Sequence, residues 1–245
     1  DYNPWYENNG GLVLAVSLAH YCYISVRFLP PFFEHRNRIV YSKMEHTNKI
    51  NEIEHPSVKA CLQYKNINNG IEIHYDGDLP ARSGIGSSSS FTVGLLNALT
   101  SLNEKSISKR DLANQAIYIE QNLLAENVGV QDQIMAVSGG FQSIVLDKEN
   151  PWKTEKITLS KDFMKNFEDH ILFGFSGISR LADAHAKKKI ENINNNIIDD
   201  QLNTIHDIAC EAKSLFQKES DIEKIGSLLN RSWIEKKKLA KGVTN

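Results

Sequence analysis

The chain has 245 residues, of which 41% are apolar and 24% are charged. These values lie close to the averages of soluble globular proteins, and they exclude a disordered, a collagen-like or a simple coiled-coil chain. Lys and Arg total 28 and Asp and Glu total 30, so the formal net charge is −2. This near-neutral balance gives no electrostatic case for nucleic-acid binding. The length allows one or two domains.

Three cysteines, Cys22, Cys61 and Cys210, are far apart and fit no zinc spacing. This usage is typical of reduced thiols in a cytoplasmic protein. No apolar run reaches the length of a membrane span, and no signal-peptide pattern is recognised at the start. We therefore expect a cytoplasmic protein with neither a membrane nor a nucleic-acid partner. The sequence leaves the oligomeric state open.

The predicted elements alternate in the first half of the chain. β-Branched and aromatic residues over 12–18 and 21–28 predict two neighbouring strands joined by a tight turn. Further strands are expected at 38–43, 71–75 and 141–146. Helices are expected at 56–64, 91–102 and 108–124, and Ser108 is the predicted N-cap of the last one.

The second half of the chain has a different pattern of predicted elements. The polar segment 149–161 contains Pro151 and predicts a linker, and the apolar run 171–175 predicts a buried strand. Almost all of 180–241 has helical patterning. Strands come first, helices are interleaved and a helical block follows, which predicts an α+β fold with two lobes.

The segment 79–90 reads LPARSGIGSSSS and lies between a predicted strand and a predicted helix. Gly84 and Gly86 let backbone N–H groups approach a ligand, and a helix starting near Ser88 points its unpaired N–H groups at the same place. Such an arrangement binds phosphate. No Lys follows the glycines, which excludes a Walker A loop, and Ser89 stands where a dinucleotide-binding fingerprint needs its third glycine. A flexible Ser/Gly turn is the structural alternative.

Two carboxylates stand out beyond this loop. Glu120 interrupts an apolar helical stripe that also contains Ala113, Ile117 and Leu124. A carboxylate on a buried stripe needs a partner, which is either a hard cation or a structural Arg, unless the side chain reaches solvent at the edge of the stripe. Asp132 lies in a glycine-containing loop before a short helix, where it can act either as an N-cap or as a general base.

The pattern P-x-x-x-G-[IL]-G-S-S-[AS] resembles the nucleotide-binding motif of the GHMP kinases. DLPARSGIGSSSSF resembles more narrowly the D-glycero-D-manno-heptose 7-phosphate kinases, as do DYNPWYENNGG, IEQNLLAENVGVQDQ and FGFSGISRLA, so the resemblance covers the whole chain. It implies an N-terminal, ribosomal-protein-S5-like lobe over 1–155 and a C-terminal, ferredoxin-like lobe over 156–245. Family members have a Gly-rich segment before the position of Asp1 and a second Gly-rich loop in the C-terminal lobe. We therefore expect this chain to lack both ends of a full-length kinase and its C-terminal lobe to be incomplete.

The resemblance also implies a set of site residues. It assigns Mg²⁺ to Ser88 and Glu120, and it makes Asp132 the catalytic base. Residues implied to bind ATP are Pro80, Ser83, Gly84, Ile85, Gly86, Ser87, Ser88 and Ser89. Residues implied to bind the substrate are Asp1, Gln131, Ser176 and Arg180.

The implied reaction is ATP-dependent phosphorylation of the anomeric oxygen of D-glycero-D-manno-heptose 7-phosphate to the 1,7-bisphosphate, on the way to nucleotide-activated heptose. Two alternatives stay open. One is another GHMP sugar-1-kinase, acting on fucose, galactose or an unphosphorylated heptose. The other is a non-catalytic remnant that keeps the nucleotide pocket.

Overall fold

The computed structural model describes residues 1–80, 83–174 and 183–240, and the chain divides into two compact units. The first unit consists of Asp1–Ser17, Asn127–Gln131 and Ser138–Asn245. The second unit consists of Leu18–Glu126 and Asp132–Val137. The chain passes between the units several times, so neither unit is one continuous segment. The expected lobes, 1–155 and 156–245, group the residues differently, and their bounds stay a prediction.

The structure has the following elements in its described part. The helices are α1 (Asn3–Asn9), α2 (Pro56–Tyr64), α3 (Ser87–Leu102), α4 (Lys109–Tyr118), α5 (Gln131–Ser138), α6 (Lys161–Asp169), α7 (Asp183–Asn194), α8 (Asp199–Gln217) and α9 (Ile222–Lys238), with a 3₁₀ turn η1 (Ile50–Glu52) and a π-helical turn η2 (Ile119–Leu123). The strands are β1 (Gly11–Val16), β2 (Cys22–Phe28), β3 (Asn37–Val40), β4 (Met44–Thr47), β5 (Ile71–Gly77), β6 (Phe141–Leu146) and β7 (Lys153–Lys156).

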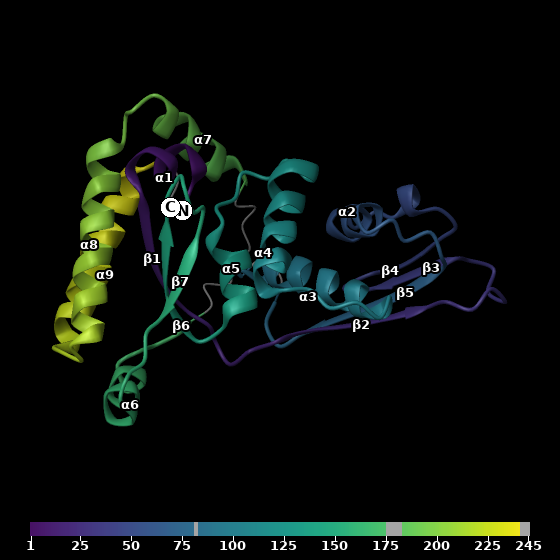
Figure 1. Ribbon diagram of the computed structural model, residues 1–245, viewed down its shortest axis with the longest axis horizontal. Helices are drawn as coiled ribbons and strands as arrows, with labels where there is room; N and C mark the ends of the chain where they lie inside the picture. Colours follow the sequence, from purple (N-terminus) through teal and green to yellow (C-terminus); the bar gives the residue numbers. More distant parts are fainter. Residues whose placement is uncertain (81–82, 175–182, 241–245) are drawn as a thin grey trace. The chain divides into compact units, whose positions relative to one another are not determined.

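The second unit contains a four-stranded sheet in the order β2-β5-β3-β4. β3 and β5 are parallel, and the other pairs are antiparallel. In this unit α2 and α3 lie over one face of the sheet (Figure 1), and α3 packs against β2. Ile39, Ile71 and Ile73 are buried in the sheet, and Leu95 and Leu99 are buried in α3. The apolar core of this unit therefore fixes the start of α3, which is where the Ser-rich loop ends.

The first unit is built on a three-stranded antiparallel sheet in the order β1-β6-β7. α8 and α9 run side by side, and α8 packs against β1 (Figure 1). Phe141 of β6, Ile157, Phe216 of α8 and Ile225 of α9 form a buried cluster, with Phe216 edge-on to Phe141. This cluster attaches the C-terminal helices to the sheet.

Helix termini agree with elementary capping rules. The Ser108 hydroxyl accepts a hydrogen bond from the backbone N–H of Asp111, so Ser108 is the N-cap of α4 as predicted. α2 covers the predicted range and begins with Pro56, whose missing N–H is harmless in the first turn. α3 differs because Gly86, with φ of +77°, precedes it and no side chain caps it. No N-cap side chain therefore occupies the first turn of α3.

The predicted turn between two neighbouring strands at 12–18 and 21–28 is wrong. β1 pairs with β6 and β2 pairs with β5, so the two strands belong to different sheets and different units. Residues 17–21 connect the units instead of closing a hairpin. Apolar patterning identified both strands, but it carries no information about their partners.

Two expectations in the second half are also wrong. The predicted linker 149–161 contains β7, which pairs with β6, and it buries Trp152 and Ile157. The predicted buried strand at 171–175 is not formed over its described residues, where Leu172 is 98% exposed. Charged residues on the edge strand β7 hid its pairing with β6. The described residues of the apolar run, 171–174, are exposed instead of buried. The helical patterning after residue 180 is confirmed in the described part by α7, α8 and α9.

Candidate functional site

The Ser-rich loop leads directly into α3 in the second unit. Gly84 and Gly86 have φ of +81° and +77°, a conformation that glycine adopts without a steric penalty. Ser87 opens the helix, Ser88 is exposed and Ser89 is buried. The Oγ of Ser83 is buried without a hydrogen-bond partner in the described part of the chain. The loop therefore presents donors and an open helix N-terminus to the same region, which suits a phosphate.

Glu120 is buried in the second unit, with 1% of its surface exposed. It lies on the π-helical turn η2 that follows α4, and such turns are frequent at functional sites. Its Oε2 accepts hydrogen bonds from Ser89 Oγ, at 2.8 Å, and from Gln133 Nε2. Its Oε1 is buried and has no hydrogen-bond partner among the described residues. Burial raises the pKa of Glu120, and the charge of Asp132 acts in the same direction.

The sequence left three environments open for Glu120: a hard cation, a structural Arg, or solvent at the edge of the stripe. The side chain does not reach solvent, and no ion pair between described residues includes it. Its recorded partners, Thr92, Ser89 and Gln133, are all neutral, which leaves a buried carboxylate without a compensating cation. Ser89 contacts Glu120 directly, and the assignment of Ser88 to the metal stays a prediction.

Asp132 lies in the first turn of α5, one residue after its start. A Cβ atom built on Gly86 would lie 3.2 Å from Asp132 Cγ and 3.3 Å from Oδ2. The carboxyl group of Asp132 therefore packs directly against the backbone of the loop. In the second unit the predicted base, the loop and Glu120 thus come together, although they lie far apart in the sequence.

Asp1 is placed in the first unit, against the segment that precedes Asp132. A Cβ atom on Gly129 would lie only 1.8 Å from Asp1 Oδ2, so no other residue fits at position 129 while Asp1 holds this place. The backbone N–H of Val130 donates to the Asp1 carbonyl oxygen at 3.3 Å. Gly129 was the signal that sequence reasoning missed for Asp1, since glycine permits this close approach. Gln131, the next predicted substrate residue, is half-buried at the start of α5.

Ser176 and Arg180 lie outside the described residues, so their predicted roles in substrate binding stay predictions. Pro80 is described and exposed at the start of the loop, and residues 81–82, which follow it, lie outside the described part.

Residues 52–140 match the family model described as the GHMP kinases N terminal domain. This segment is therefore similar to the N-terminal domain of the GHMP kinases. The loop residues from Ser83 to Ser89, together with Glu120, Asp132 and Gln133, all lie inside it. Asp1 and the region of Ser176 and Arg180 lie outside it.

The chain is similar to a curated protein of Campylobacter jejuni, named D-glycero-alpha-D-manno-heptose 7-phosphate kinase, with 26% identity over 182 residues. The match covers 71% of this chain and 51% of the relative, so the matched region spans about half the length of that protein.

Solved structures of GHMP kinases share the fold. A D-glycero-D-manno-heptose 1-phosphate kinase from Bacteroides thetaiotaomicron superposes with a TM-score of 0.76 at 19% identity, covering 97% of this chain and 74% of that one. The phosphomevalonate kinase of Streptococcus pneumoniae gives 0.71 at 12% identity, covering 95% and 75%. The galactokinase of Lactococcus lactis gives 0.62 at 16% identity, covering 96% and 72%. The chain therefore has the GHMP kinase fold, and the predicted α+β class is confirmed.

The donor set of this segment fits a Mg²⁺ ion next to phosphates. Mg²⁺ prefers oxygen ligands, and it keeps waters and substrate phosphates as most of them, so one carboxylate oxygen and one hydroxyl group suffice from the protein. The unpaired Oε1 of Glu120 is such an oxygen. The described residues contain no group of three or more His, Cys, Asp or Glu side chains that could enclose a metal without other ligands. The chemistry therefore suits a cation shared with a phosphate.

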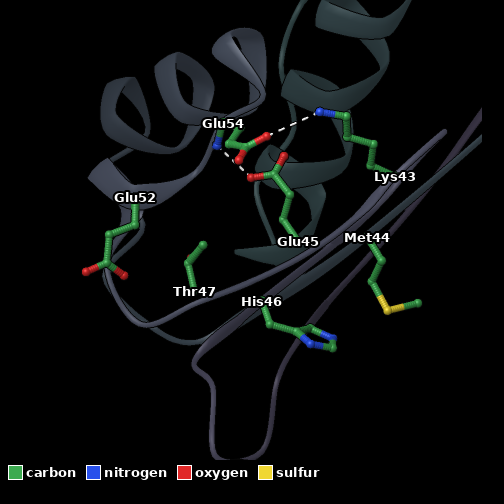
Figure 2. Close-up of a pocket in the computed structure, with 7 residues that line it drawn as sticks. All are labelled: Lys43, Met44, Glu45, His46, Thr47, Glu52 and Glu54. Carbon is green, nitrogen blue, oxygen red and sulfur yellow. Dashed lines mark hydrogen bonds and ion pairs between the residues drawn. The ribbon is translucent and has the colours of Figure 1, made fainter.

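A pocket of about 510 Å³ lies at the edge of the four-stranded sheet and contains none of the predicted site residues. Figure 2 shows Lys43 and Glu45 directed to one side of the strand and Met44 and His46 to the other. Both carboxylate oxygens of Glu45 accept hydrogen bonds from the chain itself, including one at 2.6 Å from the backbone N–H of Glu54. Lys43 Nζ pairs with the Glu54 carboxylate at 3.4 Å. These groups satisfy one another, so the pocket presents little to a ligand.

In the part of the chain that the structure describes, no helix combines the length and the apolar character needed to cross a membrane.

Proposed function

We propose that this protein is an ATP-dependent sugar kinase that phosphorylates the anomeric oxygen of D-glycero-D-manno-heptose 7-phosphate. The observation that carries the proposal is the packing of Asp132 against Gly86 of the Ser-rich loop, beside the buried Glu120. Phosphoryl transfer requires a base, a group that binds the phosphates and a ligand for the metal. Asp132, the start of α3 and the carboxylate of Glu120 would supply these three parts.

The chemistry assigned to Asp132 is general-base catalysis. Its carboxylate accepts the proton of the anomeric hydroxyl group while that oxygen forms a bond to the γ-phosphorus of ATP. The bond between the γ-phosphorus and the β–γ bridging oxygen breaks, and ADP leaves. The contact with Gly86 fixes the distance between the base and the loop, and positioning of this kind supplies much of the rate in phosphoryl transfer.

The α3 N-terminus and the loop are assigned to the phosphates. The backbone N–H groups after Gly86 and the hydroxyl groups of Ser83 and Ser87 donate to phosphate oxygens. A Mg²⁺ ion held by Glu120 Oε1 and a serine hydroxyl of the loop would neutralise phosphate charge. We keep the assignment of Ser88 to the metal, because the hydroxyl of Ser89 already donates to Glu120.

Two observations support a sugar phosphate as the substrate that accepts the phosphoryl group. The Campylobacter relative is named a heptose 7-phosphate kinase, although the structure from Bacteroides is named a heptose 1-phosphate kinase. Asp1, held against Gly129, places a carboxylate next to the segment that leads to Asp132. This carboxylate and Gln131 are suited to binding sugar hydroxyl groups.

The test has two arms. Asp132→Asn should still bind Mg·ATP but turn over at least about 10²-fold more slowly, which is the usual effect of losing a general base. Wild-type turnover in this variant would exclude Asp132 as the base. ADP release from a panel of sugars then identifies the acceptor, because only a heptose 7-phosphate kinase should lose most of its activity when the 7-phosphate is removed. If the wild-type protein releases no ADP with any sugar, and Asp132→Asn leaves ATP binding unchanged, a non-catalytic nucleotide-binding protein is the better account.

A further inference from the structure

Gln133 is fully buried, with no exposed surface, and lies on α5 directly after Asp132. Its Nε2 donates a hydrogen bond to Oε2 of Glu120. One turn of α5 therefore carries both the predicted base and a partner of the predicted metal ligand. Burying a polar side chain costs free energy unless the side chain is hydrogen-bonded, so the contacts of Gln133 within the protein indicate its role.

Side-chain hydrogen bonds from α3 and α5 hold the carboxylate of Glu120, and Thr92 of α3 is also one of its partners. Ser89 of α3 and Gln133 of α5 both donate to Oε2, and they come from two different helices. Oε1 is buried and receives no hydrogen bond from a described residue. A buried carboxylate oxygen without a partner is costly, and a bound cation would remove that cost.

We propose that Gln133 is a positioning residue, which orients Glu120 so that Oε1 is presented to a divalent cation. The inference rests on the proposed function, because it takes the cation to be the one that accompanies ATP. The two donors fix the rotation of the carboxylate, while neither of them adds positive charge that would weaken the attraction for a cation. Partners of this kind, one step removed from a metal, commonly change its affinity by about 10- to 100-fold.

The amide oxygen of Gln133 supports a specific role over a purely structural one. This oxygen is also buried and has no hydrogen-bond partner among the described residues. A glutamine that only bridged two elements of the core would be expected to use both ends of its amide group. Here the amide nitrogen alone is used, and it is used on Glu120.

The experiment measures Mn²⁺ binding by electron paramagnetic resonance, with a non-hydrolysable ATP analogue present, for wild type and Gln133→Met. Methionine keeps the volume and the apolar stem and removes the N–H donor. The Mn²⁺ dissociation constant should rise at least about tenfold, while the thermal midpoint stays within a few degrees of wild type. Unchanged Mn²⁺ affinity in a folded Gln133→Met variant would overturn the proposal.

Gln142 provides the matched control. It is also buried, at 7% exposure, but its Nε2 donates to the carbonyl oxygen of Gly139 in its own segment. Gln142→Met should therefore leave Mn²⁺ affinity unchanged, and an equal loss there would show that any buried glutamine has this effect. If Gln133→Met does not fold, Ser89→Ala removes the other donor to the same oxygen and should weaken Mn²⁺ binding in the same direction.

The outcomes also separate this proposal from the proposed function. Wild-type protein that binds no Mn²⁺ with the analogue overturns the positioning role of Gln133. Wild-type protein whose Mn²⁺ binding depends on Gln133, but which phosphorylates no sugar, supports the positioning role and overturns the sugar kinase.

Discussion

Replacing Gly86 with alanine tests whether the loop positions the base. Gly86 precedes α3 with φ of +77°, and a Cβ atom there would meet Asp132 Cγ at 3.2 Å, Oδ2 at 3.3 Å and Cβ at 3.4 Å. The substitution therefore has two separable effects. One is backbone strain in the left-handed region, and the other is a contact that pushes the carboxyl group of Asp132 by a few tenths of an ångström.

The two effects have different sizes and appear in different measurements. A non-glycine residue in the left-handed region costs about 1–2 kcal/mol, and the stiffer unfolded chain returns about 0.4–1 kcal/mol, so the net loss of stability is about 1 kcal/mol. For a chain of 245 residues this lowers the thermal midpoint by about 2 °C. A misplacement of 1 Å can cost about 10²-fold in rate, so the smaller shift of Asp132 should lower kcat by roughly three- to tenfold.

Gly140 supplies the control for strain alone. Its φ is +69°, and no atom would lie within 4 Å of a Cβ atom at that position. Thermal unfolding and steady-state ADP release should show that Gly86→Ala and Gly140→Ala lose similar stability, whereas only Gly86→Ala loses kcat. If both variants keep wild-type kcat, or both lose it equally, the contact between Gly86 and Asp132 does not position the base.

Three further predictions concern stability and reactivity. Phe216 is buried between two other aromatic rings, so Phe216→Ala should lower the free energy of unfolding by about 3–5 kcal/mol in urea titrations, and a loss below about 1 kcal/mol would contradict the described core. Hydrogen bonds from His74, Arg27 and Arg38 lower the pKa of Glu72 from 4.5 to about 2, so its contribution to stability is fully present above pH 4.5 and is lost as the pH falls towards 2. Because Arg27 and His74 are partly exposed, water screens this network, and Glu72→Gln should cost roughly 1–2 kcal/mol at pH 7. The variant should also flatten the acid limb of a stability–pH curve, and an unchanged curve would refute the network. Burial raises the pKa of Cys61 to about 12, so iodoacetamide should label the exposed Cys210 in the folded protein and Cys61 only after unfolding, as mass spectrometry would show.

Local structure was predicted well where the signal lies within a few residues. The helix 56–64 was placed correctly because Pro56 fixes its start. Ser108 was identified as an N-cap because its side chain bonds to a backbone N–H only three residues away. The partner of β1, by contrast, lies more than 120 residues further along the chain, and alternation of apolar residues says nothing about such a distance.

The candidate site could be predicted in its residue types but not in its contacts. The apolar stripe around Glu120 indicated a carboxylate in a buried position, which agrees with its exposure of 1%. Which serine contacts it could not be predicted, because the choice between Ser88 and Ser89 depends on how α3 is rotated against η2. The role of Gln133 was hidden for the same reason, since its partner lies thirteen residues earlier on another element.

The sugar-kinase activity, with Asp132 as its base, is tested by ADP release with Mg·ATP and D-glycero-D-manno-heptose 7-phosphate, measured side by side for wild type and Asp132→Asn. The account predicts release that requires the sugar phosphate, yields a product phosphorylated at the anomeric oxygen and falls at least about 10²-fold in the variant. Release that does not depend on the sugar phosphate, or that persists at the wild-type rate in Asp132→Asn, would contradict it.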